Sequence, residues 1–221
     1  MTNNGSSAKI VTLSSITMAI TGASGIPYAK RLLSYLVKSG VQIRLIYSSA
    51  AQIVAKQECD WELASDMQIA TQRLEHEFNA APEQIKVFAH DDWFSPAASG
   101  SNVSDAMVIC PASMGTIAAI ACGLSDNLIE RAADVCLKEK RQLILVPRET
   151  PLSTIHLSNL LKLSECGAVV IPPSPAFYHH PQSIDDLIDF VVARILNHLN
   201  IEHDLLNRWG EGLKKHLQNP Y

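Results

Sequence analysis

The stretch ITMAITGASGIPYAKRLLSYLVKSG, residues 16–40, gives the clearest indication of the fold. Residues 16–21 form a β-branched apolar run, which is typical of a buried strand. Four small residues follow, and Pro27 then stands where the first turn of a helix tolerates proline. Helical spacing continues to Ser39, and Gly40 ends it. The pattern therefore predicts a strand, a tight turn and a helix.

The same alternation continues along most of the chain. Short apolar runs predict further strands at 41–47, 85–88, 106–110, 143–146 and 168–171. Periodic segments predict further helices at 48–56, 63–79, 115–122, 127–140, 157–166, 183–199 and 202–217. Short buried strands that alternate with helices indicate a parallel sheet covered on both faces. We therefore expect an α/β fold with a doubly wound, mainly parallel sheet, a Rossmann- or flavodoxin-like three-layer sandwich.

Length and composition favour one soluble domain. The chain has 221 residues, of which 47% are hydrophobic and 18% charged. A single domain over residues 1–221 is expected, with 1–14 as a flexible N-terminus and 202–221 as a helical tail. The formal charge of −4 argues against broad binding to nucleic acid. The low charged fraction also suits a chain that hides surface in contacts between subunits.

The sequence gives no sign of export or of membrane insertion. Residues 1–7 are polar and do not resemble a signal peptide. Residues 106–125 carry no charge, but a buried strand, a loop and a buried helix explain them better than a membrane span. Five cysteines without a Cys-x-x-Cys pair favour free thiols in a reducing compartment. We therefore expect a cytoplasmic protein.

Ligands of doubly wound folds bind beyond the carboxyl ends of the strands. Three small or hydroxyl-bearing loops are expected there, at residues 22–25, 48–51 and 110–116. Such loops let backbone N–H groups and hydroxyls approach an anion at a helix start. Each loop alone could be an ordinary tight turn or helix cap. Together they suggest a mononucleotide with a phosphate and a polar chain, such as FMN.

Charged residues on two further segments could contact a phosphate or do chemistry. Arg131 and Lys138 are seven residues apart and share a helix face, which suits a phosphate. A surface ion pair of Asp134 with Lys138 is the alternative. Arg148 and Glu149 lie between two prolines just after a buried strand, where catalytic groups are common in this fold class.

The proline-rich loop at 172–182 and two tryptophans complete the candidates. Tyr178 in this stiff loop could donate to a phosphate oxygen, whereas the adjacent His179 and His180 do not form a metal-binding pattern. Arg194 lies at the edge of a helical apolar stripe, as surface arginines often do. Trp93 and Trp209 could line a ligand site or pack in an interface.

Four motifs together resemble those of the flavin prenyltransferases of the UbiX type. They are ITGASG at 20–25, NLIERAAD at 127–134, VPRETP at 146–151 and AFYHHPQS at 176–183. The resemblance implies transfer of a dimethylallyl group from dimethylallyl phosphate to N5 and C6 of reduced FMN. It also implies a homo-oligomer, a dodecamer, with sites between subunits. The product, prenylated FMN, would serve a partner decarboxylase of the ubiquinone or aromatic-acid pathways.

The resemblance also implies roles for individual residues. FMN contacts are implied at Gly22, Ala23, Ser24, Ser48, Ser113, Met114, Gly115, Thr116 and Arg148. Contacts to the prenyl phosphate are implied at Arg131, Lys138, Tyr178 and Arg194. Catalytic roles are implied for Ser24 near flavin N5, for the acid–base carboxylates Glu58 and Glu149, and for an aromatic wall of Trp93 and Trp209. Fixed cations would stabilise the departing phosphate, and aromatic faces the allyl cation.

Two other functions remain open on the sequence. An FMN-dependent cysteine decarboxylase would have a similar fold, but it would need a His-Asn motif and a Pro-x-Met-Asn loop. Here residues 111–114 read PASM with no Asn after them, and Ser48 and Ser49 stand where the His is expected. A non-enzymatic FMN carrier or regulatory subunit is the third reading.

One acidic motif predicts a metal site at first sight. Residues 185–189 read DDLID, the Asp-Asp-x-x-Asp pattern by which other prenyltransferases hold magnesium on a diphosphate. Ser183 precedes it as an expected helix N-cap, and Asp186 stands at the partner position of a capping box. We therefore expect no metal, and a monophosphate donor.

Overall fold

The computed structural model describes residues 13–206, which form six strands and seven α-helices. The strands are β1 Ser15–Ile20, β2 Gln42–Tyr47, β3 Ile85–Phe88, β4 Ala106–Ala112, β5 Gln142–Pro147 and β6 Val169–Val170. The helices are α1 Ile26–Lys38, α2 Ser49–Cys59, α3 Met67–Phe78, α4 Met114–Ala121, α5 Leu128–Lys138, α6 Thr154–Glu165 and α7 Ile184–His198.

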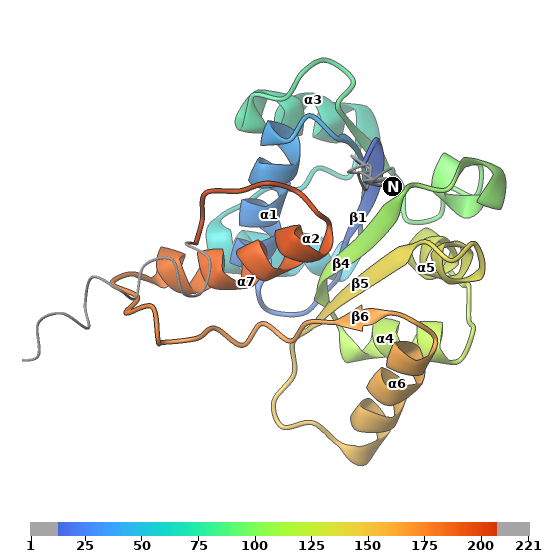
Figure 1. The fold of residues 1–221 in the computed structure, drawn as a ribbon. Coiled ribbons are helices and arrows are strands. Elements are labelled where there is room, and N and C mark those ends of the chain that lie inside the picture. Colours follow the sequence, from blue (N-terminus) through green and yellow to red (C-terminus); the bar gives the residue numbers. More distant parts are fainter. Residues whose placement is uncertain (1–12, 207–221) are drawn as a thin grey trace, which may run out of the picture.

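The six strands form one parallel sheet in the order β3-β2-β1-β4-β5-β6 (Figure 1). The chain winds outward from β1 to β3, crosses back to β4 beside β1, and winds outward in the other direction. The order therefore reverses between β1 and β4. In doubly wound sheets this switch point opens the ligand crevice at the carboxyl ends of the strands. The predicted fold class is confirmed.

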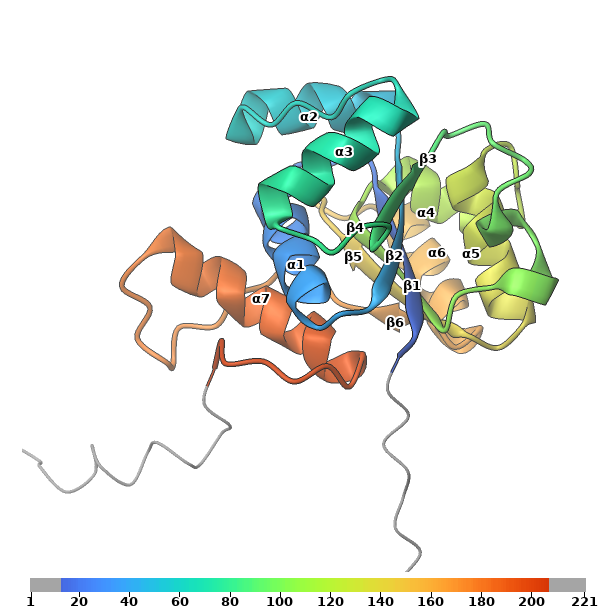
Figure 2. The same cartoon turned by 90° about the horizontal axis from the view of Figure 1, so that it is seen from above.

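Helices cover both faces of the sheet, as seen from above in Figure 2. Helix α1 packs against α2, α3 and α7 on one face, and α4 packs against α5 and α6 on the other. Each face has its own core of fully buried side chains, with Ile16, Leu33 and Leu45 in one and Ile109, Ile117 and Leu145 in the other. The alternating pattern of the sequence therefore becomes three layers.

The structure corrects several predicted boundaries. Helix α3 begins at Met67 rather than at residue 63, because the Asp66 side chain accepts hydrogen bonds from the first turn. Helix α6 begins at Thr154, three residues early, because Ser153 and His156 form a capping box. Two short 3₁₀ turns, Pro96–Ala98 and Gly100–Asn102, interrupt the loop at 90–104.

The two predicted terminal segments fall mostly outside the described residues. Residues 202–206 are not helical, and the remainder of the helix expected at 202–217, with Trp209, is not described. The expected flexible segment at 1–14 is described only for its last two residues. Between residues 13 and 206, every helix is too short or too polar to cross a bilayer.

Candidate active site

The N-terminus of α1 is occupied by a carboxylate of the same chain. Gly25, with φ 118°, is the N-cap residue and offers no side chain to the helix start. Glu58, at the end of α2, instead accepts hydrogen bonds on Oε2 from the N–H groups of Gly25 and Ile26, each at 2.9 Å. A negative charge there complements the helix dipole. The loop at 22–25 therefore binds an anion, as predicted, but that anion is the carboxylate of Glu58 and not a ligand phosphate.

Ser24 before α1, Glu58 on α2 and Arg148 after β5 gather around this helix start. The hydroxyl of Ser24 is hydrogen-bonded to Glu58, and Nε of Arg148 donates to the Ser24 carbonyl oxygen at 3.4 Å. Burial raises the pKa of Glu58, but bonds from Ser24, Gly25 and Ile26 and the charge of Arg148 lower it below its ordinary value. Glu58 is therefore a charged proton acceptor at neutral pH.

Gly22 has a structural reason that needs no ligand. A Cβ atom at residue 22 would lie 2.4 Å from the Cβ of Ala50, at the start of α2. The turn after β1 therefore packs directly on the next helix, and glycine is needed for that approach. Gly22 therefore has a packing role in this turn, and a flavin contact through its backbone stays a prediction.

Serine hydroxyls cap the helices after β2 and β4. Ser48 Oγ accepts from the N–H of Ala51 at 3.1 Å, and Ser113 Oγ accepts from that of Thr116 at 3.3 Å. The N-cap alternative is therefore correct for both serines. The Ser113 and Thr116 hydroxyls are also hydrogen-bonded to each other at 3.0 Å, so one hydroxyl hydrogen of this pair is left for donation. The first N–H groups of a helix have no intrahelical acceptor. Both helix starts can accordingly still bind an anion.

Thr21 joins two of these loops and was not predicted as a site residue. Its hydroxyl donates to the Pro111 carbonyl oxygen at 2.8 Å and accepts from the N–H of Ser113 at 2.7 Å. Thr21 is buried at the end of β1, beside the switch point. The signal in the sequence was a threonine at the end of a mostly apolar run, directly before the small-residue loop.

The first turn of α4 leaves space beside it. Gly115 is exposed, and a Cβ atom there would have no heavy atom within 4 Å. The packing of this chain therefore does not require glycine at 115. Met114, in contrast, is buried in the core on this face of the sheet, so only its backbone could contact a ligand. The two serine-capped helix starts and Arg148, which together form the candidate cradle, all follow strands at the carboxyl ends of the sheet. Their N–H groups, hydroxyls and charge are the kinds of group that bind a phosphate and a polar chain.

Arg148 and Glu149 follow β5 and are both exposed. The Glu149 carboxylate accepts from the N–H of Thr150 at 3.1 Å. The prediction that this loop reaches the carboxyl edge of the sheet is confirmed. Arg148 contacts the residue 24 loop, whereas Glu149 is available to a substrate.

The cations of α5 are paired differently from the predicted surface pair. Arg131 contacts Asp134 at 2.9 Å and donates to the Ala98 carbonyl oxygen at 3.1 Å. Lys138 pairs with its neighbour Glu139 at 2.5 Å. The expected Asp134–Lys138 pair is therefore wrong, because Asp134 is already engaged by the arginine one turn earlier.

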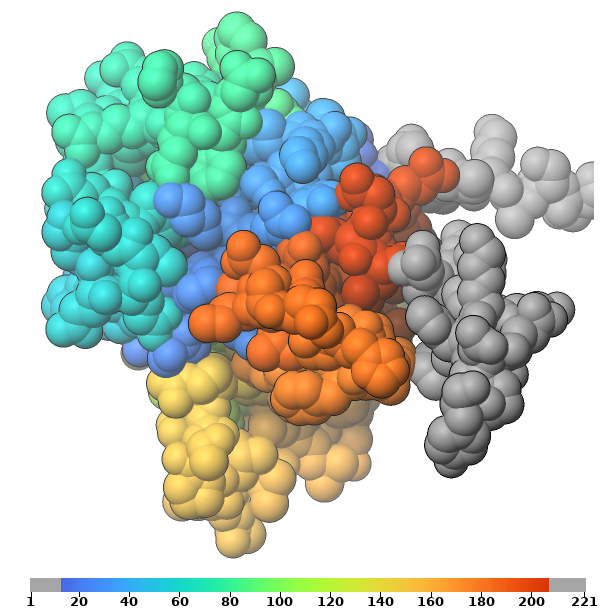
Figure 3. All heavy atoms as spheres, turned by 90° about the vertical axis from the view of Figure 1, so that its left-hand side faces the viewer, coloured from blue at the N-terminus to red at the C-terminus, as the bar shows by residue number. Residues whose placement is uncertain are grey.

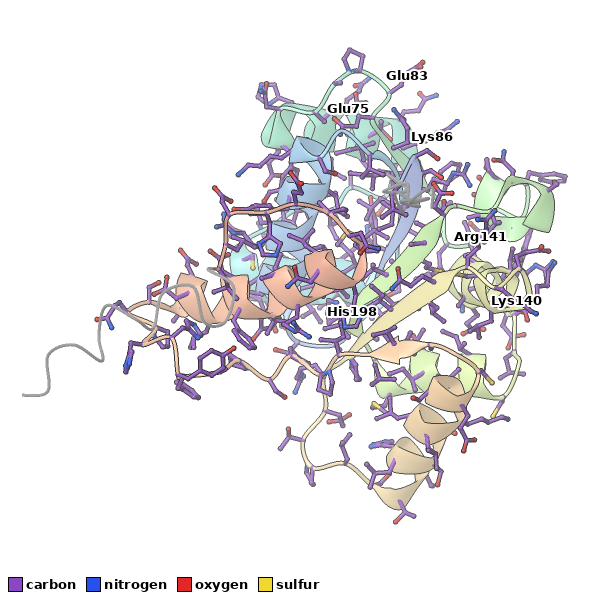
Figure 4. All side chains as sticks on the ribbon, viewed as in Figure 1. Glu75, Glu83, Lys86, Lys140, Arg141 and His198 are labelled. Carbon is purple, nitrogen blue, oxygen red and sulfur yellow. The ribbon has the colours of Figure 1, made fainter. Side chains whose placement is uncertain are left out.

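Lys138 lies near the amino ends of the strands, whereas Arg148 lies at their carboxyl ends. It ends α5 just before β5 begins, and Arg148 follows β5 directly. Figure 4 labels Lys140 and Arg141, which come just after Lys138, at the end of the sheet where β5 starts. Six strand residues at about 3.3 Å each separate the two edges by about 20 Å. One chain therefore does not bring these two cations to one phosphate.

The other predicted contacts lie apart from this cluster. Tyr178 packs edge-on against Phe190 of α7, with ring centroids 5.9 Å apart, and lines a pocket beside α7. Arg194 is exposed on α7, as predicted. Trp93 is 48% exposed in the loop over α5. The described residues thus give three groups of candidates, at the carboxyl edge of the sheet, on α5 and beside α7.

A doubly wound sheet with serine-capped helix starts beyond the carboxyl ends of its strands is typical of proteins that bind a nucleotide, flavoproteins among them, at the switch point. Residues 5–196 match the model of the family described as Flavoprotein. The chain is 55% identical over 196 residues to the flavin prenyltransferase UbiX of Pseudomonas aeruginosa, covering 89% of this chain and 94% of that protein. The chain belongs to the Flavoprotein family and, within it, to the flavin prenyltransferases.

Two solved structures agree with this assignment. AnUbiX, in complex with FMN and dimethylallyl pyrophosphate, is 39% identical with a TM-score of 0.79, covering 90% of this chain and 98% of its own. A dodecameric FMN-dependent UbiX-like decarboxylase from Escherichia coli O157:H7 is 38% identical with a TM-score of 0.78, covering 88% of this chain and 98% of its own. The resemblance inferred from the four motifs is confirmed.

Proposed function

We propose that this chain transfers a dimethylallyl group from dimethylallyl phosphate to N5 and C6 of reduced FMN. Reduced FMN supplies the two nucleophilic positions. The Ser24, Glu58 and Arg148 cluster carries the proposal, because it places a hydroxyl, a charged carboxylate and a cation together at the switch point. Such a set can position a flavin, move a proton and neutralise a departing phosphate.

The chain's own residues divide these tasks. The starts of α2 and α4, with Ser48, Ser113, Gly115 and Thr116, are proposed to hold the FMN phosphate and ribityl chain. Arg148 is proposed to stabilise the charge of the leaving phosphate. Glu58 and Glu149 are proposed to accept and return protons, because both are carboxylates on the carboxyl edge of the sheet.

The test is direct. The protein is incubated without oxygen with FMN, a reductant and dimethylallyl phosphate, and the flavin is analysed by mass spectrometry. A flavin heavier by one five-carbon unit is expected. Unchanged FMN would contradict the proposal and favour the carrier or regulatory subunit. Loss of carbon dioxide from an added cysteine-terminated substrate would favour the decarboxylase instead.

We infer that the binding site for the prenyl phosphate is completed by another copy of the chain. Lys138 and Arg148 lie at opposite edges of the sheet in one chain, so a shared phosphate requires two chains. Helix α6 and the loop before it also expose an apolar surface, made of Leu152, Ile155, Leu157 and Leu161. Surfaces of this kind mark contacts with other chains. A homo-oligomer, a dodecamer as in the solved E. coli relative, with Arg131, Lys138, Tyr178 and Arg194 around the prenyl phosphate, follows from this proposal.

The prenylated flavin is proposed to leave the enzyme and serve a partner decarboxylase. This step rests on the family, because a cofactor made by one enzyme has value only when another enzyme binds it. The enzyme is proposed to act in the cytoplasm, where reduced FMN is available.

Gly115→Ala is expected to weaken FMN binding without harming the fold. The added methyl group meets no atom of this chain, and alanine in an exposed helix raises stability by up to about 1 kcal/mol relative to glycine. The methyl would occupy the proposed cradle, so FMN affinity should fall about tenfold, or about 1.4 kcal/mol. Denaturant unfolding of the apoprotein and fluorescence titration with FMN measure the two effects. Unchanged affinity would remove Gly115 from the flavin site.

The reaction is expected to proceed without a metal ion. Asp186 accepts from the N–H groups of Gln182 and Ser183 at 2.7 and 3.0 Å, which confirms the predicted capping box. Asp189 is held by Arg31 through two bonds, at 2.6 and 2.8 Å. Two carboxylates of the DDLID motif are therefore engaged by groups of the protein.

Turnover of dimethylallyl monophosphate should consequently persist in excess EDTA and in Asp185→Asn. In the part of the chain that the structure describes, no three His, Cys, Asp or Glu side chains are grouped to hold a metal. Activity that disappears on chelation and returns with magnesium would move the donor site to the start of α7. A requirement for the diphosphate, the donor form bound by AnUbiX, would contradict the monophosphate part.

A further inference from the structure

The segment that carries Glu58 is attached to α1 at two points. Glu58 binds the N-terminus of α1 through Gly25 and Ile26. Three residues later, Trp61 is buried, with 3% of its surface exposed, in the core beneath α1. Figure 3 shows α1, in blue, between residues 49–78, in cyan and green, and α7, in orange. The second attachment is therefore inside the packed layer.

Trp61 reaches α1 through one hydrogen bond and one ion pair. Its indole N–H donates to Glu77 Oε2 at 2.8 Å. Glu77 Oε1 pairs with Nζ of Lys30 at 2.6 Å, and the same Nζ lies 5.4 Å from the centroid of the Trp61 ring. Lys30 follows Ile26 by four residues, so both lie on one face of α1. The ring of Phe78 closes the cluster edge-on at 6.1 Å.

The parts of this cluster contribute unequally. The Lys30 and Glu77 side chains are 38% and 35% exposed, so their ion pair alone contributes little. Trp61 is almost fully buried, and its ring supplies most of the contact area. Glu77 matters because it fixes the direction of the indole. Helix α2 has ended at Cys59, and Asp60 has a left-handed φ of 49°. Asp60 and the backbone of Trp61 are tied back to α2 itself, through Lys56 at 2.6 Å and the Ala55 carbonyl oxygen at 3.1 Å. The indole is the polar side-chain group that ties residues 60–61 to another helix.

We propose that Trp61, Glu77 and Lys30 are positioning residues that hold Glu58 against the N-terminus of α1, beside Ser24 and Arg148. The consequence for catalysis rests on the proposed function, because it requires Glu58 to move a proton. The effect on the position of Glu58 does not rest on the proposed function. Loosening the indole lets residues 58–61 shift, and the N–H groups of Gly25 and Ile26 then lose their acceptor.

The chain offers a matched control one residue from Trp61. Glu62 pairs with Lys56 at 3.1 Å and with Arg73 at 3.7 Å, and its side chain is 64% exposed. These pairs lie on α2 and α3 and do not reach α1. Glu62→Ala therefore removes one carboxylate in the same neighbourhood, as Glu77→Ala does, without touching the attachment to α1. Alanine is chosen because the carbonyl oxygen of a glutamine at residue 77 could still accept from the indole N–H.

The experiment compares Glu77→Ala and Trp61→Phe with Glu62→Ala in the assembled protein. Trp61→Phe keeps an aromatic ring in the core but removes the donor together with part of the ring volume, so the α4 peptides serve to separate local loosening from general destabilisation. Hydrogen exchange by mass spectrometry should be faster in peptides covering residues 24–28 of the first two variants, by about fivefold or more. Peptides from α4 and the whole Glu62→Ala variant should match the wild type. The turnover number should fall about tenfold with unchanged FMN affinity.

Two results would overturn the proposal. Wild-type exchange at residues 24–28 in both Glu77→Ala and Trp61→Phe would show that the cluster does not hold Glu58. Equal loosening of all peptides would make the cluster a general element of stability. Failure of the proposed function is distinguishable, because a wild-type protein that does not prenylate FMN leaves the exchange comparison intact.

Discussion

Glu149→Gln is expected to slow closure of the new flavin ring about 100-fold or more while FMN still binds. Glutamine keeps the size of the side chain, and its carbonyl oxygen can still accept from the N–H of Thr150. It cannot take the proton released from C6 when the second bond, the carbon–carbon bond to C6, forms. Glu149 is exposed beyond β5, beside Arg148 that contacts the Ser24 loop, so it is free to meet a substrate there. Rapid-quench mass spectrometry under anaerobic conditions measures the rate.

Glu83→Gln is the matched control for this variant. Figure 4 labels Glu83 on the loop between α3 and β3, far from the loop after β5. The same loss of one carboxylate there should leave turnover unchanged. Wild-type turnover of Glu149→Gln would remove this residue from the mechanism and leave the proton to Glu58 or to the bound phosphate.

The fold was accessible from the sequence because its signals are local. Apolar runs of four to seven residues and a glycine or proline near their ends mark the strands, and the sheet order follows the rules of doubly wound folds. The start of α6 was placed late because its capping box pairs Ser153 with His156. Histidine is an unusual partner in that box, where glutamate or glutamine is expected.

The site was predictable only in part, because its groups meet through the fold. The small-residue loop at 22–25 indicates an anion, but periodicity does not tell that Glu58, at the end of the next helix, supplies it. Only the resemblance to the family pointed to Glu58. The buried Trp61 carried no signal either, because its partners Lys30 and Glu77 lie on two other helices.

The placement of Lys138 shows a different limit. Its spacing from Arg131 correctly predicts a shared helix face, but the spacing says nothing about which edge of the sheet that face reaches. The length of β5 decides this, since it separates Lys138 from Arg148 by about 20 Å. In the proposed site Lys138 contacts a phosphate bound by another copy of the chain, and the sequence of one chain does not indicate such a contact.

Two inactive variants are therefore expected to restore activity to each other. Lys138→Ala and Arg148→Ala should each lower prenyl transfer by about 100-fold or more, because each removes a cation from the leaving phosphate. When both chains are co-expressed and assemble together, some sites receive Lys138 from one chain and Arg148 from the other. Mixed assemblies should recover about a quarter of the wild-type rate, because each residue of a shared site is drawn at random from the two chains.

The control pairs two variants from the same edge of one chain. Glu58 and Arg148 meet around Ser24 within a single chain, so every site built from Glu58→Gln and Arg148→Ala chains lacks one of them. This mixture should stay inactive. Recovery confined to the Lys138 mixture would place the phosphate between two copies of the chain. Within one chain, a distance of about 20 Å keeps Lys138 from a phosphate bound beside Arg148. If the Lys138 mixture is as inactive as the control, the proposal that two chains share the site is therefore contradicted.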